Sequence, residues 1–536
     1  MKRWLILLAA TLLVSPVTAS AAPPAGVKLA AEQVLHRGNG SEPQSLDPHK
    51  SEGVPSSNIQ RDLFEGLVSE APDGELVPGA AESWEISEDG KTYLFHLRRN
   101  AVWSNGDPVT AHDFVFSWRR IVDPMTGSYY SQTLAPILNA EAIIQGKMPK
   151  ERLGVEALDD YTLKVTLKGP TPYFLGLLTH SSTYPVNRQN VEQYGEKFAR
   201  PGRLVSNGAF VLKEWRVQSH IVLERNPRYW DDANTTLDKV IYYPIEDQST
   251  ELKRYRAGEL DTTEAFPLTQ LGWLRKNIPD EVRIAPYLGT YYYGFNLTRP
   301  PFKDNRKLRQ ALTMVVDREI LTGKVLRAGE IPAYGWVPPG VLHYEAVEYE
   351  WKKLSKEERL AEARRLYQEA GYSRENPLTV EIRYNTNENH KKIAVAIGVM
   401  WKRALGVRVR LVNEEWKVFL ENRKQKRLTQ VFRAGWIADY NDAYSFAELL
   451  HSRHGINDSG YDNPEYDALL EASAHEPDLK KREELLRRAE RIMINDYPIL
   501  PIYFYVSKHV VKPWVGGWVD NIMDHHYSKH LYILEH

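Results

Sequence analysis

Strand-like and helix-like segments alternate along most of this chain. In residues 93–97 apolar and polar side chains alternate, which is the pattern of a half-buried strand. Further along, Ser355 and Glu358 have the spacing of a capping box, and Gly371 ends the helical pattern that follows. The repeated change between the two patterns predicts α/β layers.

The same two patterns place most of the elements that we expect. Strands are predicted over residues 93–97, 162–167, 208–214, 220–225, 240–245, 287–296, 378–384, 407–412 and 499–506. Helices are predicted over residues 57–65, 111–121, 247–257, 305–315, 318–326, 355–371, 389–405 and 478–494. Residues 126–130 are predicted to form a loop that exposes Tyr129 and Tyr130.

The first residues have the composition of a targeting segment. Lys2 and Arg3 form a positive region, residues 4–14 are apolar, and the small residues 19–21 form a cleavage site. The apolar run is shorter than the roughly 20 residues needed to span a bilayer. We therefore expect a signal peptide over residues 1–21, cleaved after Ala21, and an exported protein. Cysteine is absent, which leaves no lipobox for an acyl anchor and no disulfide framework.

Length and charge limit the classes of protein that fit. The remaining chain of about 515 residues is too long for one core and suggests two or three domains. Lys and Arg number 69 and Asp and Glu 70, and this balance argues against a nucleic-acid partner. No dense basic block would hold an anionic membrane. The 30 tyrosines and 14 tryptophans fit both large mixed cores and the amphipathic walls of a binding pocket.

Residues 433–442 combine groups that suit a zwitterionic peptide. Arg433 can hold a carboxylate by bidentate hydrogen bonds, and the Asp439 carboxylate can hold an ammonium group. Between them, Gly435 has no Cβ to obstruct a ligand backbone, and Trp436 adds a large aromatic surface. On this pattern alone, a strand end with a surface ion pair is the simpler interpretation.

The usual catalytic signatures are missing. The sequence contains no Gly-x-Ser-x-Gly, no His-Glu-x-x-His, no P-loop and no dinucleotide fingerprint. His525, His526 and His530 lie in a polar segment without a strong helix pattern, so we predict no metal site and no cofactor. Because catalytic groups can assemble from distant residues, a periplasmic peptidase stays open as a second class. A chaperone-like binder of unfolded chains is a third.

Several short blocks occur in order along the chain. They are Ser-Leu-Asp-Pro-His at 45–49, Arg-Asp-Leu-Phe-Glu-Gly at 61–66, Trp-Ser-Asn-Gly-Asp-Pro-Val-Thr at 103–110, Tyr-Asn-Thr at 384–386 with His390, residues 433–442, and Val-Lys-Pro-Trp-Val-Gly-Gly at 511–517. In these blocks the chain resembles the periplasmic oligopeptide-binding proteins of ABC importers, solute-binding protein family 5. The resemblance implies a protein that captures short peptides, of about two to five residues with tolerance of sequence, and delivers them to an ABC permease.

The resemblance also implies an architecture. We expect an α/β, two-lobed periplasmic-binding-protein fold of type II, with hinge strands and an extra inserted domain. Lobe I would comprise residues 22–65, 186–288 and 507–536, the inserted smaller domain residues 66–185, and lobe II residues 289–506. The expected protein is a monomer in the periplasm without a lipid anchor.

The family mechanism can be carried over to the matching positions of this sequence. The peptide ammonium group is expected to meet Asp439. The peptide backbone is expected to pair with Glu52, Gly53 and Val54 on one wall and with Gly435 to Ile437 on the other. Residues that match side-chain pockets are Tyr130, Tyr292, Trp416, Arg423 and Trp436. Arg433 and His390 match two of the cations that meet the carboxyl end at different peptide lengths.

Two departures from the family pattern make the chain more similar to murein-tripeptide-binding relatives. Oligopeptide binders commonly have a lysine where this chain has Leu326, and two cysteines where it has Gly289 and Ile437. A murein-tripeptide binder is therefore an alternative. Without that lysine, we expect tripeptides to bind through Arg433 and tetrapeptides through His390.

Overall fold

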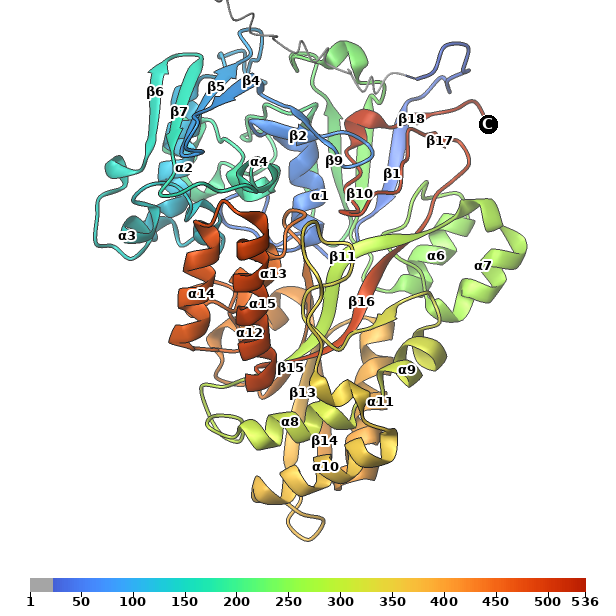
Figure 1. The fold of residues 1–536 in the computed structure, drawn as a ribbon. Helices are drawn as coiled ribbons and strands as arrows, with labels where there is room; N and C mark the ends of the chain where they lie inside the picture. Colours follow the sequence, from blue (N-terminus) through green and yellow to red (C-terminus); the bar gives the residue numbers. More distant parts are fainter. Residues whose placement is uncertain (1–22) are drawn as a thin grey trace, which may run out of the picture.

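The largest sheet of the protein has six strands (Figure 1). The computed structural model describes residues 23–536, so the signal peptide expected over residues 1–21 lies outside the described residues. In spatial order the strands are β12 (Ile331–Pro332), β16 (Ile499–Val510), β11 (Val282–Phe295), β15 (Val431–Ile437), β13 (Thr379–Asn385) and β14 (Arg408–Glu414). Pairing is antiparallel from β12 to β15 and parallel from β15 to β14, which makes this a mixed sheet.

A four-stranded sheet holds both ends of the described chain together. Its order is β1 (Val34–Gly38), β10 (Lys239–Tyr243), β9 (His220–Arg225) and β8 (Phe210–Arg216). Beside it, β17 (Val515–Gly516) pairs with β18 (Tyr532–Ile533), and Leu29 bridges to Leu534. The amide of Ala30 donates to the carbonyl of Ile533 at 2.9 Å. Figure 1 shows the C-terminal strands beside β1.

The third sheet lies within residues 66–185, the segment expected to be an inserted domain. Its order is β4 (Ala81–Ile86), β5 (Thr92–Leu97), β7 (Thr162–Thr166) and β6 (Val155–Asp159), with α2 (Ala111–Val122) packed against it. A capping box between Thr110 and Asp113 starts α2, and Phe114 and Trp118 are fully buried on its inner face. The buried side chains of this segment are continuous with the large apolar core that extends into the six-stranded sheet.

Two long strands of the six-stranded sheet, β11 and β16, extend toward the four-stranded sheet that contains β1. β11 has 14 residues and β16 has 12, and they pair from Val282 with Val510 to Gly294 with Ile499. The register shifts between Pro286 and Thr290, which is a bulge where a pair of strands can bend. Figure 1 shows both strands running from the upper lobe into the lower one. They are the hinge strands expected from the sequence.

Helices cover the sheets of both lobes. The longer ones are α1 (Val54–Leu63), α6 (Gln248–Arg256), α8 (Arg306–Val315), α10 (Lys356–Glu369), α11 (Glu388–Leu405), α12 (Trp416–Gln425), α14 (Pro464–Ala474) and α15 (Leu479–Asp496). The short ones are α3 (Ala140–Ile144), α4 (Phe174–Leu177), α5 (Arg188–Tyr194), α7 (Leu271–Asn277), α9 (Arg318–Ile320) and α13 (Tyr444–Ala447). Every helix in residues 23–536 is too short or too polar to cross a membrane.

Most of the predicted elements are confirmed to within a few residues. The capping box of Ser355 and Glu358 starts α10, and Asp317 caps α9 as expected. Residues 318–326 are helical, but they widen into a π-helical segment from Leu321 to Leu326. The sequence analysis missed α12, because one of its inward positions is the charged Arg423, which interrupts the apolar pattern.

The guanidinium of Arg318 is fully buried in the lobe that contains the six-stranded sheet. Its Nε donates to the carbonyls of Ala333 at 2.6 Å and Pro501 at 2.9 Å. Its Nη1 donates to the carbonyls of Thr313 at 3.3 Å and Val316 at 3.0 Å. One side chain thereby joins the end of α8, the residue after β12 and strand β16.

Candidate functional site

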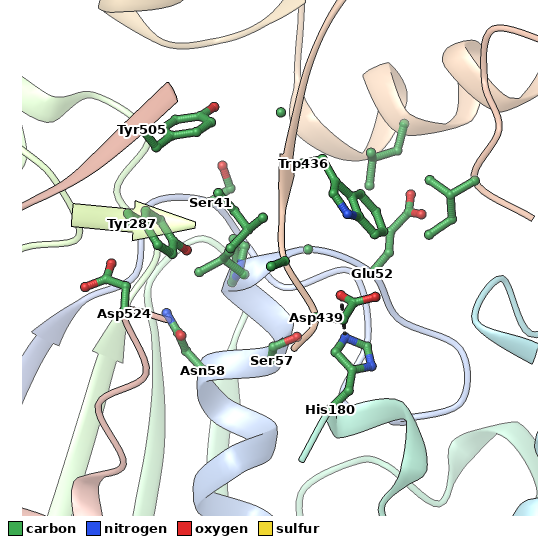
Figure 2. A pocket seen from close by; sticks show the side chains of 18 of the residues that line it. Ser41, Glu52, Ser57, Asn58, His180, Tyr287, Trp436, Asp439, Tyr505 and Asp524 are labelled. Carbon is green, nitrogen blue, oxygen red and sulfur yellow. Dashed lines mark ion pairs between the residues drawn. The ribbon is translucent and has the colours of Figure 1, made fainter. Parts of the chain in front are cut away.

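A cavity of about 310 Å³ lies between the two lobes. Its walls come from the start of α1, from α12, from β15 and the loop after it, and from the loops that carry Tyr130 and His180. Figure 2 shows Asp439 facing His180 on one side, with Tyr287, Tyr505 and Asp524 on the opposite side. A second cavity of about 240 Å³ adjoins the first, because residues such as Glu264, Arg433 and Tyr505 line both.

The first cavity brings together every predicted peptide-binding residue except His390. The residues are Glu52, Gly53, Val54, Tyr130, Tyr292, Trp416, Arg423, Arg433, Gly435, Trp436, Ile437 and Asp439. His390 lines the second cavity instead. The structure thus gathers residues separated by almost 400 positions in the sequence.

Strand β15 has a free edge at this cavity. Toward β11 it is paired throughout, from Val431 with Phe295 to Ile437 with Gly289. Toward β13 only Val431 and Phe432 are paired, so the edge from residue 433 to residue 437 has no partner strand within residues 23–536. An unpaired edge with alternating amides and carbonyls is a template for an added strand.

The opposite wall is a helix start rather than the extended strand that we expected. Val54 is already the first residue of α1 and Gly53 is a bend, so residues 52–54 do not form the expected extended run. Gly53 has φ +88°, and a Cβ there would lie 3.1 Å from the Trp416 indole. Glycine is therefore required at this position both by conformation and by space. Glu52 is buried with its carboxylate 3.2 Å from the Lys424 ammonium group across the cleft.

Among residues 23–536, no Lys or Arg side chain forms an ion pair with the buried Asp439 carboxylate. His180 Nε2 lies 3.3 Å from Asp439 Oδ1. The Ser182 amide donates to His180 Nδ1, which places the imidazole proton on Nε2, and burial lowers the pKa of His180 to about 3. Burial raises the pKa of the Asp439 carboxyl to about 8, although the charge of Arg61 acts in the opposite direction. The Asp439 site is thus suited to an ammonium group that supplies the missing charge.

Glu448 is a second buried carboxyl group near this end of the cleft. Its carboxylate accepts a hydrogen bond from Tyr440 at 2.9 Å. Burial, and then the neighbouring Asp439 charge, raise the pKa of Glu448 well above its usual range. Two carboxyl groups in one buried region favour the arrival of a cation.

Arg433, on strand β15, carries a positive charge close in sequence to Asp439. Its guanidinium donates to Asn385 at 3.2 Å and to Tyr505 at 3.0 Å, and it lies 4.9 Å from the centre of the Tyr291 ring. Within residues 23–536 it forms no ion pair, whereas Arg423 is paired with Asp458. Its buried Nε also has no hydrogen-bond partner there. Arg433 can therefore hold a ligand carboxylate.

The structure corrects the role expected for His390. Its Nδ1 lies 3.3 Å from the Tyr291 hydroxyl. Burial, and then the nearby Arg433 charge, hold the pKa of His390 well below its usual range. The imidazole is neutral at physiological pH, so it can offer a ligand a hydrogen bond but not a positive charge.

Two other expectations about side chains need correction. Tyr130 is 7% exposed and lies with its ring 4.6 Å from that of His180, so the loop over residues 126–130 does not expose it. Leu326 is 2% exposed and lines neither cavity. The side chain of Leu326 is not placed to influence a ligand carboxylate, which removes the basis for expecting it to set peptide length.

Gly289 and Ile437 are cross-strand neighbours, as the family pattern implies.

Several cavity residues were not found from the sequence. Arg61, His180, Tyr287 and Tyr505 line the first cavity, and Glu264 lines both cavities. His180 lies in a short turn that no motif marks, and only its contact with Asp439 identifies it. Arg61 and Tyr287 belong to segments that the sequence analysis had selected for other reasons.

The histidines of the C-terminal segment do not form the group considered from the sequence. His525 Nδ1 lies 2.7 Å from Glu70, and His530 Nε2 lies 3.2 Å from the carbonyl of Glu70. His526 lies instead beside Asp524 and His509.

The comparisons with known proteins define the family. Residues 75–458 match the family described as bacterial extracellular solute-binding proteins, family 5. The chain is 47% identical to the periplasmic oligopeptide-binding protein OppA of Escherichia coli (strain K12), covering 98% of this chain and 97% of that protein. It is 44% identical to the periplasmic murein peptide-binding protein MppA of the same organism, covering 98% of both. The chain belongs to solute-binding protein family 5, which confirms the resemblance inferred from its motifs.

Solved structures agree with this fold. The structure of Escherichia coli MppA has a TM-score of 0.93 at 43% identity, covering 95% of this chain and all of that one. Haemophilus influenzae OppA in complex with the peptide RPPGFSPFR has a TM-score of 0.92 at 44% identity over the same shares. The unliganded open form of MppA has a TM-score of only 0.67, covering 96% of this chain and 99% of that one. The fold is the two-lobed α/β architecture with hinge strands that the resemblance implied.

Proposed function

We propose that this protein captures short peptides between its lobes and delivers them to an ABC permease. The observation that carries the proposal is the free edge of β15 between residues 433 and 437. It lies between Asp439, a buried carboxyl group, and Arg433, a guanidinium, neither of which has an oppositely charged Lys, Arg, Asp or Glu partner within the described residues 23–536. A zwitterionic peptide supplies an ammonium group, a pairing backbone and a carboxylate, which are the three complementary features. The names of the relatives OppA and MppA support this choice of ligand.

Each predicted residue has a specific role in this proposal. Asp439 binds the peptide ammonium group, residues Gly435 to Ile437 pair with the peptide backbone, and Arg433 binds the carboxylate of a peptide that ends beside it. Glu52, Gly53 and Val54 close the opposite wall. His390 donates a hydrogen bond to longer peptides. The side-chain pockets are lined by Tyr130, Tyr292, Trp416, Arg423 and Trp436. Water in these pockets accommodates side chains of different size and charge.

The experiment that tests the function is native mass spectrometry of the protein purified from its source without denaturation. We expect co-purifying ligands of about two to five residues, with varied sequences and free amino ends. Protein that carries only long polypeptides, or no peptide after exposure to a mixed peptide pool, would exclude the proposal.

Peptide affinity is expected to increase as the pH rises from about 6 to about 8. A carboxyl group with a pKa of about 8 holds its proton at lower pH, while a bound ammonium group favours the ionised form, so binding releases a proton. Affinity should change by up to about tenfold per pH unit and fall again as the peptide amino group, of pKa about 8, loses its own proton. His180 stays neutral throughout this range.

Titration calorimetry in two buffers with different ionisation enthalpies measures this proton release directly. The observed binding enthalpy should differ between the buffers at pH 6.5 and should converge near the top of the range. Identical enthalpies in both buffers at every pH would show that Asp439 is already ionised before binding.

The lobes lie in a closed arrangement. The Ser249 hydroxyl on α6 donates to Glu388 on α11 at 2.5 Å, and Asn389 donates to Gln248 at 3.0 Å. Tyr173 stacks on Tyr440 and on Tyr444, each with ring centres 5.2 Å apart. The closeness to one structure of MppA and the distance from its unliganded open form agree with closure. In the proposed division, lobe I comprises residues 22–65, 186–288 and 507–536, lobe II residues 289–506, and the inserted domain residues 66–185.

Saturating peptide is expected to reduce the radius of gyration of the ligand-free protein. The lobes are joined by a bulged pair of strands, which permits hinge closure of the kind seen in periplasmic binding proteins. Small-angle X-ray scattering of protein stripped of ligand by unfolding and refolding measures the change. Asp439→Asn protein, which should not bind, is the control and should show no change. A scattering profile that stays constant while calorimetry confirms binding would indicate a rigid cleft.

We also propose that the protein acts in the periplasm and does not cleave its ligand. The relatives are named as periplasmic binding proteins. Cleavage after Ala21 would release a mature protein that has no cysteine for a lipid anchor. N-terminal sequencing of the protein from a periplasmic extract tests the first point. Mass spectrometry of a peptide pool before and after incubation tests the second, because a peptidase would generate fragments.

Murein tripeptide is the second candidate ligand. The TM-score to MppA, 0.93, is close to the 0.92 to OppA. Gly289 and Ile437 stand where oligopeptide binders can have two cysteines. Calorimetry with murein tripeptide and with trialanine decides between the two, since a dedicated murein binder would prefer the first by a wide margin.

A further inference from the structure

Two histidines and an aspartate from separate segments meet beside the second cavity. His509 lies near the end of β16, and Asp524 and His526 lie in the C-terminal segment. One ligand atom from each lies within 4.8 Å of the others. His509 Nε2 is 2.9 Å from Asp524 Oδ2, and His526 Nε2 is 3.0 Å from Asp524 Oδ1. The three side chains are 4–12% exposed, so this is a buried cluster.

The His509 ring is held in the tautomer that a metal ligand needs. Its Nδ1 lies 2.9 Å from the carbonyl of Thr263, which can only accept, so Nδ1 carries a proton. Nε2 is the atom that faces Asp524. A histidine that donates its other ring N–H to a backbone carbonyl is the common arrangement around protein-bound metals.

The orientation of His526 is fixed as well. Its ring stacks on the Trp518 indole with centres 3.7 Å apart, and its backbone carbonyl accepts a hydrogen bond from Arg37 at 2.8 Å. Both imidazoles therefore present Nε2 to the same carboxylate without further rearrangement of the chain.

One side of the cluster is open. His509 and Asp524 line the second cavity, and Asp524 also lines the first. Three protein ligands with a fourth position open to a cavity are typical of metal sites that exchange a ligand. In a tetrahedral site with bonds of about 2.0–2.1 Å, the ligand atoms lie about 3.3 Å apart, so small shifts of the three side chains would admit an ion.

We propose that His509, Asp524 and His526 bind a divalent transition-metal ion, with Zn²⁺ as the probe, and that its open position faces the cavity next to the peptide cleft. Imidazole nitrogen and carboxylate oxygen form a ligand set suited to such ions. This site is independent of the peptide contacts at Asp439 and Arg433 and goes beyond the proposed function.

A proton competes with the metal for the same nitrogen. His509 Nε2 lies 2.9 Å from Asp524 Oδ2, so a proton can be shared between the two groups. The charged groups that face this ring are Asp524 and Glu264, and His526 is a third titratable neighbour. A metal ion must displace any proton held between these groups, so its binding depends on pH.

Zn²⁺ binding to untagged, chelator-treated protein at pH 8 tests the proposal. Calorimetry should show one ion per chain, with a binding enthalpy that depends on the ionisation enthalpy of the buffer. His509→Gln and His526→Gln should each weaken binding at least tenfold, while His112→Gln, at an exposed histidine, should not. Co²⁺ should give the intense visible absorption of a four-coordinate site in wild type and lose it in both variants.

Thermal melting of each variant establishes that it is folded before its affinity is interpreted. Absence of stoichiometric binding, or equal binding by wild type and by folded His509→Gln and His526→Gln proteins, would overturn the metal site. The cluster would then be an imidazolium–carboxylate group that only joins β16 to the C-terminal segment. Peptide binding measured in the presence of a chelator reports on the proposed function separately.

Discussion

Asp439→Asn is expected to lower peptide affinity by about two to three and a half orders of magnitude. Removing one partner of a buried charge pair costs about 3–5 kcal/mol, since the other charge stays desolvated without compensation. Asparagine retains the shape of the side chain but offers no charge to the ammonium group. Calorimetry with a free tripeptide measures the loss, and Asp462→Asn, at an exposed aspartate, is the matched control.

The same substitution should not destabilise the ligand-free protein. The backbone amide of Asp439 is held by Ser445 Oγ at 2.8 Å, a bond that the variant keeps. The carboxyl group itself is buried beside a neutral histidine, so its removal breaks no stabilising ion pair. An N-acetylated tripeptide should bind wild type as weakly as the free peptide binds the variant. Equal affinity of wild type for acetylated and free peptides would contradict the assignment of Asp439.

Arg318→Met is expected to destabilise the protein by about 3–5 kcal/mol, the largest stability effect predicted for a residue outside the cleft. The four carbonyls that accept from Arg318 belong to Thr313, Val316, Ala333 and Pro501, and methionine would leave them buried without donors. Denaturant unfolding followed by fluorescence measures the change.

The control for this effect is Arg491→Met, at an exposed position of α15. Its effect should stay within about 0.5 kcal/mol of wild type. If Arg318→Met unfolds at the same denaturant concentration as the control, water must replace the guanidinium as the donor to these carbonyls.

Local sequence signals predicted the elements of the fold well. The box of Ser355 and Glu358 and the cap at Asp317 act within one helical turn, so they can be identified without knowledge of the tertiary structure. Helix α12 was missed because its inward Arg423 is neutralised by Asp458, a partner 35 residues away. Long-range pairing of charges is not visible in a local pattern.

The resemblance to the family predicted which residues line the cleft. The charge states of those residues could not be predicted from the sequence. The family pattern placed Asp439 and Arg433 correctly in one cavity. It assigned His390 as a cation, whereas burial and the Arg433 charge keep that ring neutral. It gave no sign of His180, because only the folded chain brings that side chain beside Asp439. Charge states depend on burial, and burial is a property of the folded chain.

The pairing of the two ends of the described chain has a consequence for the order in which the protein can fold. Gln33 donates to the carbonyl of Ile533 and accepts from its amide, both at 2.9 Å, and Asp62 on α1 accepts from the Ser528 amide at 2.9 Å. The partners of these early segments therefore leave the ribosome up to 500 residues after them. Contacts of such long sequence separation form slowly, because the whole intervening chain must be ordered first. During synthesis the upper lobe lacks its final strands, so the nascent chain remains open to chaperones and to a translocation channel until the last residues are made.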